Sequence, residues 1–156
     1  MKRSLAAFVL LFLSLLRGGA SNGQELTKDD EGLFTTPEQT ASVPLNNGEA
    51  VVITIPTIVR GNLSVVTEDI SRAELRFRKR AFTDSRRKAF DYIDVVNITI
   101  SRAYEGAEIE CRAPASPDWT DDEYVSLELE LTLPKGTILR MDAPKVHAVV
   151  EGPLAG

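Results

Sequence analysis

The chain has 156 residues, of which 43% are hydrophobic and 26% charged, and its formal net charge at neutral pH is −5. An acidic protein is repelled by nucleic-acid phosphates, so this charge argues against a nucleic-acid partner. The single cysteine, Cys111, excludes a disulfide within the chain. We expect its thiol to be buried as a small apolar group, the alternative being a bond to a second chain.

Residues 1–20 have the order of a secretory signal peptide. Two basic residues precede an apolar run, Leu5–Leu16, and small residues follow as far as Ala20. The run is shorter than the about 20 residues that a membrane-spanning helix needs. We therefore expect cleavage near Ala20, a periplasmic or secreted location and no transmembrane segment in the mature chain. An uncleaved N-terminal anchor is the alternative, and Arg17 slightly favours it.

Residues 21–48 are predicted to form a flexible linker. The segment is rich in Asn, Gly, Asp and Thr and contains few large apolar residues. Such a composition buries too little apolar surface to offset the entropy lost on ordering. The segment would hold the folded part away from the membrane or from a processing site.

Residues 49–152 are predicted to form a β-rich domain, because apolar and polar residues alternate with a period of two. The clearest case is Val125–Leu133, whose odd positions are all apolar and whose even positions are all polar. Turn residues separate the predicted strands. These strands cover residues 51–55, 63–67, 75–78, 96–100, 107–111, 125–133, 138–141 and 146–150. The expected fold is mostly β, with short strands stacked as a β-solenoid or as a β-sandwich.

One short helix is predicted near residues 84–92. Ala89, Phe90 and Ile93 have the spacing of one helical face, and basic residues lie on the other. Thr83 or Asp84 is the expected N-cap.

Three stretches of the sequence, 61–67, 85–100 and 129–139, together resemble a bacterial family of putative adhesins of unknown function. Domains of that family are β-helical or β-solenoid parts of envelope proteins. The resemblance covers residues 50–150 and implies a non-catalytic, adhesin-like or structural module of the cell envelope. Family members continue with further repeats, so this chain resembles a short or truncated member. Its last strands would offer an open edge for self-association or for another chain.

The residue types that carry catalysis are sparse in this sequence. His147 is the single histidine, and no phosphate-binding loop, nucleophile elbow or zinc-protease motif occurs. The acidic residues at 118 and 121–123 do not have the spacing of a calcium loop, and we interpret them as a solvated loop. We therefore expect no enzymatic activity, no cofactor and no metal site.

The positive charges of the mature chain are concentrated in residues 72–88. This segment holds 8 of the 15 basic residues that remain after residues 1–20 are removed. If they share a face, they could bind anionic envelope polymer, lipid headgroups or an acidic protein, which is the alternative function. A solvated outer face is the other interpretation. The candidate binding residues are Arg72, Arg76, Arg78, Arg80, Arg86 and Arg87.

Overall fold

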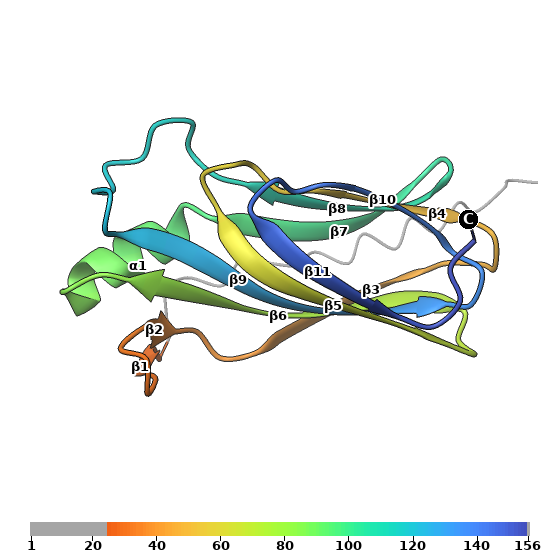
Figure 1. The fold of residues 1–156 in the computed structure, drawn as a ribbon, viewed down its shortest axis with the longest axis horizontal. Helices are drawn as coiled ribbons and strands as arrows, with labels where there is room; N and C mark the ends of the chain where they lie inside the picture. Colours follow the sequence, from red (N-terminus) through yellow and green to blue (C-terminus); the bar gives the residue numbers. More distant parts are fainter. Residues whose placement is uncertain (1–24, 156) are drawn as a thin grey trace, which may run out of the picture.

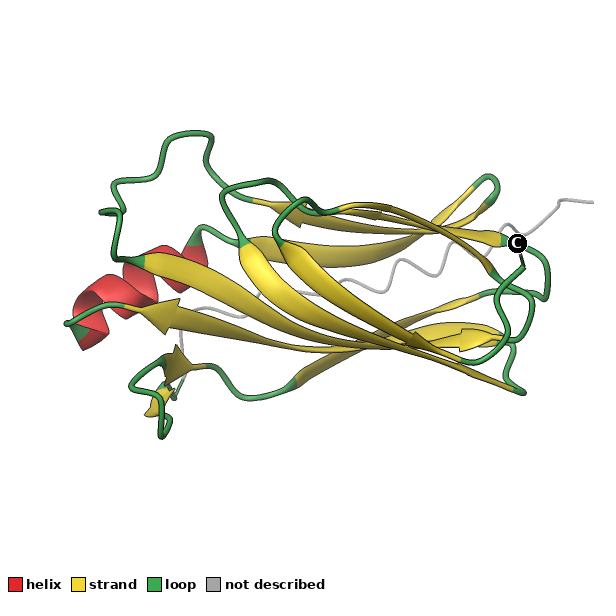
Figure 2. Ribbon diagram, viewed as in Figure 1, coloured by secondary structure: helices red, strands yellow, loops and turns green. Residues whose placement is uncertain are grey.

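The computed structural model describes residues 25–155, which form two facing β-sheets with one helix at an end of the molecule (Figures 1 and 2). The seven-stranded sheet has the order β1 (Thr27–Lys28), β2 (Phe34–Thr35), β6 (Arg72–Phe82), β9 (Tyr124–Pro134), β5 (Arg60–Glu68) and β11 (Val146–Glu151), and β3 (Gln39–Pro44) also pairs with β6. The four-stranded sheet has the order β10 (Ile138–Asp142), β4 (Ala50–Thr54), β8 (Gly106–Arg112) and β7 (Asn97–Ala103). The helix α1 spans Arg86–Asp94. The prediction of a mostly β fold with one short helix is confirmed.

The centre of the fold is a stack of three strand–turn–strand units. The units β8–β9, β4–β5 and β10–β11 each cross from the four-stranded to the seven-stranded sheet. Neighbouring units pair in parallel, since β4 lies between β8 and β10, and β5 lies between β9 and β11. Parallel stacking of units is a property of solenoids, whereas two facing sheets are the property of a sandwich. This fold has both.

The space between the sheets is filled by the apolar side chains of the alternating strands. On β9 the odd positions from Val125 to Leu133 are all buried, at 3% exposure or less. Strand register places Leu129 beside Leu63 of β5 on one side and Phe77 of β6 on the other. Side chains that share a sheet face and a register position pack together, which gives one continuous core.

The segment preceding residue 49 differs from its prediction. A flexible linker was expected for residues 21–48, but residues 25–48 contribute three strands and several core side chains. β3 pairs with β6 along its whole length, and Leu45 just after it is fully buried. Backbone pairing with β6 orders a segment that has little apolar surface of its own, so the linker prediction is wrong there. Residues 21–24 lie outside the described part.

The helix predicted near residues 84–92 is confirmed, but its N-cap is neither Thr83 nor Asp84. The N-cap is Ser85, whose hydroxyl oxygen accepts a hydrogen bond from the backbone N–H of Lys88 at 3.3 Å. Ala89 and Ile93 face the core as expected, and the buried Tyr92 joins them. Asp84 is exposed, and the Thr83 hydroxyl bonds to a glutamate instead.

No helix among residues 25–155 is both long enough and apolar enough to cross a membrane. The predicted signal peptide lies outside the described residues.

Candidate binding surfaces

The stack of strand–turn–strand units ends openly on one side, at β10 and β11. Each of these strands is the last in its sheet, and in the described chain β10 pairs with β4 alone and β11 with β5 alone. The two strands form one unit, so both unpaired edges lie on the same side of the molecule. We call this side, residues 138–151, the open edge. Within residues 25–155 no further strand pairs with this edge, so its outward N–H and C=O groups can pair with the strand of another chain.

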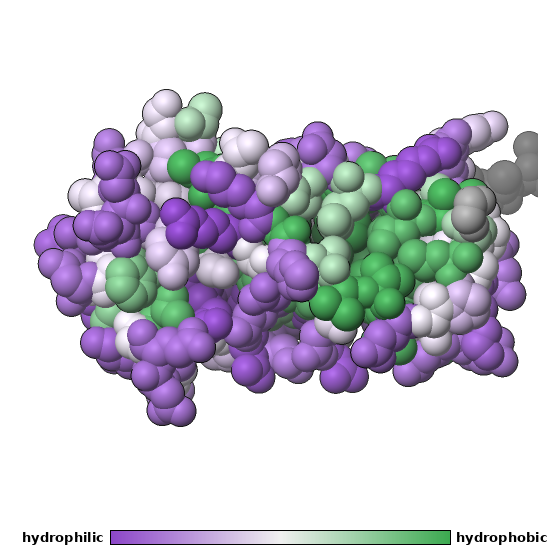
Figure 3. Space-filling view, in the orientation of Figure 1, coloured by the Kyte–Doolittle hydropathy of each residue, from purple (hydrophilic) through white to green (hydrophobic). Residues whose placement is uncertain are grey.

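The open edge exposes apolar side chains that would be buried in the middle of a sheet. Register puts Met141 beside the fully buried Ile53, and Val150 beside the fully buried Val65, yet their exposures are 42% and 43%. Val149, on the outer face of β11, is 48% exposed. These are three of the six large hydrophobic residues exposed in the described chain. Figure 3 shows the resulting apolar area where β10, β11 and the C-terminal segment lie in Figure 1.

The outer positions of β11 carry a histidine near one end and a glutamate at the other. His147 lies two residues before Val149 and Glu151 two residues after it, and all three are exposed. The single histidine is therefore a surface residue of an edge strand. The residues that the structure describes contain no group of three or more His, Cys, Asp or Glu side chains placed to hold a metal ion.

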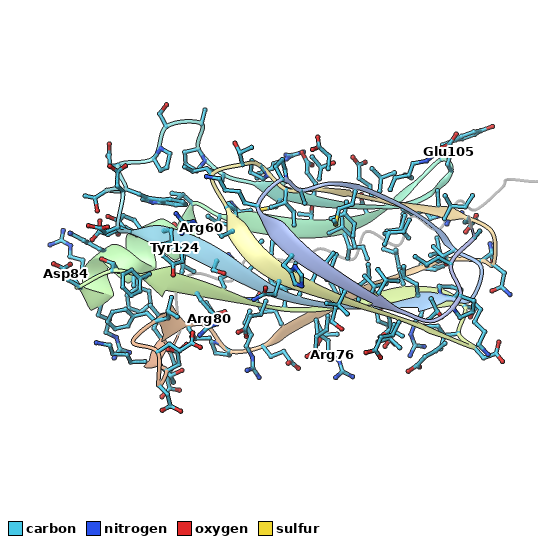
Figure 4. The ribbon with its side chains drawn as sticks, in the orientation of Figure 1. Arg60, Arg76, Arg80, Asp84, Glu105 and Tyr124 are labelled. Atoms are coloured by element: carbon cyan, nitrogen blue, oxygen red, sulfur yellow. The ribbon has the colours of Figure 1, made fainter. Side chains whose placement is uncertain are left out.

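The six predicted binding arginines lie in two places. Arg72, Arg76, Arg78 and Arg80 alternate along β6 and share the outer face of the seven-stranded sheet, as the period-two pattern implies. Figure 4 shows two of them, Arg76 and Arg80. The remaining two, Arg86 and Arg87, lie on α1 at the end of the molecule. The structure therefore brings four of the six together. Lys79, from the same basic segment, points into the core and is 8% exposed.

Acidic side chains surround the four β6 arginines. Register places Arg76 opposite Glu130 and Arg78 opposite Glu128, both on β9. Arg80 contacts Glu128 at 2.7 Å and Glu31 at 3.0 Å, and it also pairs with Asp29. The outer face of this sheet thus has mixed charge.

A cluster of polar contacts around Glu123 joins α1 to the loop before β9. The Glu123 carboxylate accepts hydrogen bonds from the Tyr92 hydroxyl at 2.6 Å, the Thr83 hydroxyl at 2.8 Å and the Lys88 ammonium at 3.0 Å. The bond from Tyr92, followed by those from Lys88 and Thr83, lowers the pKa of Glu123 to about 2. The sequence pattern predicts a solvated acidic loop at this position. The contacts of Glu123 could not be predicted from local sequence, because the three donors lie more than thirty residues earlier in the chain.

A row of three side chains crosses the outer face of the seven-stranded sheet near α1. The Arg60 guanidinium lies 4.4 Å from the centre of the Tyr124 ring (Figure 4). That ring stacks on Phe82, with centroids 5.4 Å apart. Stacking of this kind stabilises the end of the sheet. The sequence gives no signal for it, since the three residues come from three strands.

The thiol of Cys111 is buried, as the sequence predicts, at 5% exposure. Burial raises its pKa to about 11. Nearby, the ammonium of Lys79 donates a hydrogen bond to the carbonyl oxygen of Ile93 in the last turn of α1, at 3.3 Å. Burial lowers the pKa of this lysine.

Comparison with known proteins gives one structural similarity. No known protein family matches the sequence, and no curated protein does. Among solved structures, the fold is similar to that of a putative adhesin from Bacteroides fragilis, with a TM-score of 0.34 and 8% sequence identity. The similarity covers 73% of this chain and 42% of that one. A TM-score of this size does not assign the chain to a family.

Proposed function

We propose that this protein is an exported, non-catalytic module of the cell envelope, adhesin-like or structural, that binds another polypeptide through the open edge. The observation that carries the proposal is the apolar, unpaired edge formed by β10 and β11. The predicted signal peptide and the sequence resemblance to envelope domains support the location.

The character of the open edge favours a binding role. Soluble β-proteins usually protect their edges with inward-pointing charges, prolines, bulges or a covering segment. In β11 the inward-pointing positions 146, 148 and 150 are Val, Ala and Val. Exposed apolar surface of this kind marks interaction sites, and a strand added to the edge would gain main-chain hydrogen bonds as well.

The open edge accounts for a binding role better than the predicted arginine face does. The β6 arginines lie beside Glu128, Glu130 and the acidic residues of the N-terminal segment. Their positive field is therefore partly cancelled, which weakens attraction to an anionic polymer or headgroup.

A binding experiment with envelope fractions separates the two surfaces. We expect the mature chain, diluted until it is monomeric, to bind in a way that changes little with added salt, and we expect Val149→Lys to abolish binding. The matched control replaces Arg76 and Arg78 by serine and should bind normally. A steep loss of binding with salt, together with loss in the arginine variant, would contradict the proposal and favour the arginine face.

A further inference from the structure

One polypeptide that fits the open edge is a second copy of the same chain. We infer that β11 pairs with the partner's β11 in antiparallel orientation, around a two-fold axis that passes beside Val149. This inference rests on the proposed function, because it names the polypeptide that the open edge binds.

The topology of the stack favours a symmetric pair over a chain of head-to-tail copies. Head-to-tail stacking needs two free edges, one on each side of the β8–β9, β4–β5 and β10–β11 units. On the β8–β9 side the antiparallel strands β6 and β7 follow the stack, and the two sheets meet there because β3, paired with β6, contacts β7. A second copy therefore meets the open edge with its own open edge, which is the arrangement of a closed two-fold dimer.

The residues of β11 are complementary to themselves in the antiparallel direction. If Val149 lies opposite the partner's Val149, then His147 lies opposite the partner's Glu151, and Ala148 lies opposite the partner's Val150. An imidazole thus faces a carboxylate that can accept its hydrogen bond, and a small side chain faces a larger one. Two-fold symmetry repeats each of these pairs, so the complementarity acts twice.

This register also keeps the two sides of the sheet distinct. Ala148 and Val150 lie beside the core residues Leu63 and Val65, so both belong to the inner face. His147, Val149 and Glu151 belong to the outer face, because positions alternate along a strand. A slip by one residue would bring inner positions against outer ones and expose the apolar side chains again.

The inferred dimer covers the apolar surface left open in one copy. Val150 would gain a neighbouring strand on its exposed side, and the sheet would continue through the interface as one sheet with twice the number of strands. Met141 and Leu139, at the edge of the four-stranded sheet, would face the same residues of the partner across the extended interior.

Sedimentation equilibrium of the mature chain is the first test, and we expect a dimer. Val149→Lys places two ammonium groups opposite each other and should raise the dimer dissociation constant by at least about tenfold. The matched control is Ser64→Lys, which carries the same change on the same outer face one strand further in, and should leave the dimer unchanged.

Cysteine cross-linking tests the register independently of any loss of folding. Val149→Cys should form a disulfide dimer on mild oxidation, since opposite Cα atoms in an antiparallel pair lie about 4.5–5.5 Å apart. His147→Cys alone should not, because its symmetry mate would lie roughly 13 Å further along the strand. Mixing His147→Cys with Glu151→Cys should restore the cross-link. Cross-linking of Ala148→Cys with itself, in place of Val149→Cys, would overturn the stated register.

The two proposals fail in different ways. A mature chain that stays monomeric at every concentration, while Val149→Lys still abolishes binding to envelope fractions, overturns the second copy as partner and leaves the open edge as the binding site. A monomer whose envelope binding also survives Val149→Lys overturns both.

Discussion

The two sides of the strand stack differ in whether further elements cover their outer strands. On the β8–β9 side, β6 and β7 add antiparallel strands, α1 connects them across the end of the sandwich, and β3 pairs with β6. The last strand on this side, β7, is held at its exposed end, where Arg102 pairs with Glu49 and donates to the carbonyl oxygen of Pro44 at 3.3 Å. On the β10–β11 side, two short strands end the sheets without such a cover in the described chain.

The contrast shows that inner-face position and burial are separate properties. Leu131 on β9 and Met141 on β10 both occupy inner positions of alternating strands, yet their exposures are 1% and 42%. Alternation determines the face on which a side chain lies, whereas the order of strands in the sheet determines whether that face is covered. The covered side is therefore expected to supply stability, and the open side to supply contacts with a partner.

The largest expected effect compares these two leucine-sized residues directly. Leu131→Ala should lower the free energy of unfolding by about 3 kcal/mol, because a central cavity replaces a packed side chain. Met141→Ala should cost less than about 1 kcal/mol, because its site is already open to water. Urea denaturation of both variants in dilute solution measures the difference. Equal losses would show that the edge strand is as enclosed as the centre.

A smaller effect is expected at the contact that fastens α1 to the covered side. Glu123 has its pKa lowered from 4.5 to about 2, so the stability it adds is present above pH 4.5 and is lost as pH falls toward 2. Glu123→Gln should be less stable than the wild type at neutral pH, and the gap should shrink as the solution is acidified through that range. Denaturation midpoints against pH measure it. Asp122→Asn, a change at the exposed neighbouring residue, is the control, and an equal deficit in it would refute the role of Glu123.

The smallest expected loss of stability comes from removing the N-cap of α1, and it tests which residue is that cap. Ser85→Ala should cost about 1 kcal/mol, since the N–H of Lys88 loses its acceptor. Asp84→Ala, at the position that the sequence suggested as a cap, should cost less. Thermal unfolding of the two variants ranks them, and the reverse order would restore the sequence-based assignment.

Most of the strands after residue 49 were predictable because each has one buried and one solvated face. Gly106–Arg112 and Tyr124–Pro134 agree closely with the alternating runs, whereas Ala50–Thr54, which has no exposed position, agrees with a run of β-branched residues. The N-terminal strands were not predictable in this way. β3 contains a single large apolar residue, Val43, and it is ordered by backbone hydrogen bonds to β6 that leave no hydropathy pattern.

The candidate surfaces were less predictable than the strands, because they depend on which strands become neighbours. Alternation correctly placed Arg76 and Arg78 on one face, but only the register of β6 with β9 puts Glu128 and Glu130 against them. In the same way, the sequence suggested an open edge at its last strands through the resemblance. The exposure of Met141 and Val149 follows from β10 and β11 lying at the ends of their sheets.

The enclosed thiol of Cys111 has a practical consequence for work on this protein. With a pKa of about 11, about one thiol in ten thousand is ionised at neutral pH, and that small fraction is shielded from reagents. The native protein should therefore resist alkylation and oxidative coupling even under oxidising conditions. Iodoacetamide would then modify Cys111 only when the two sheets separate. The rate of alkylation would therefore report the rate at which the fold opens.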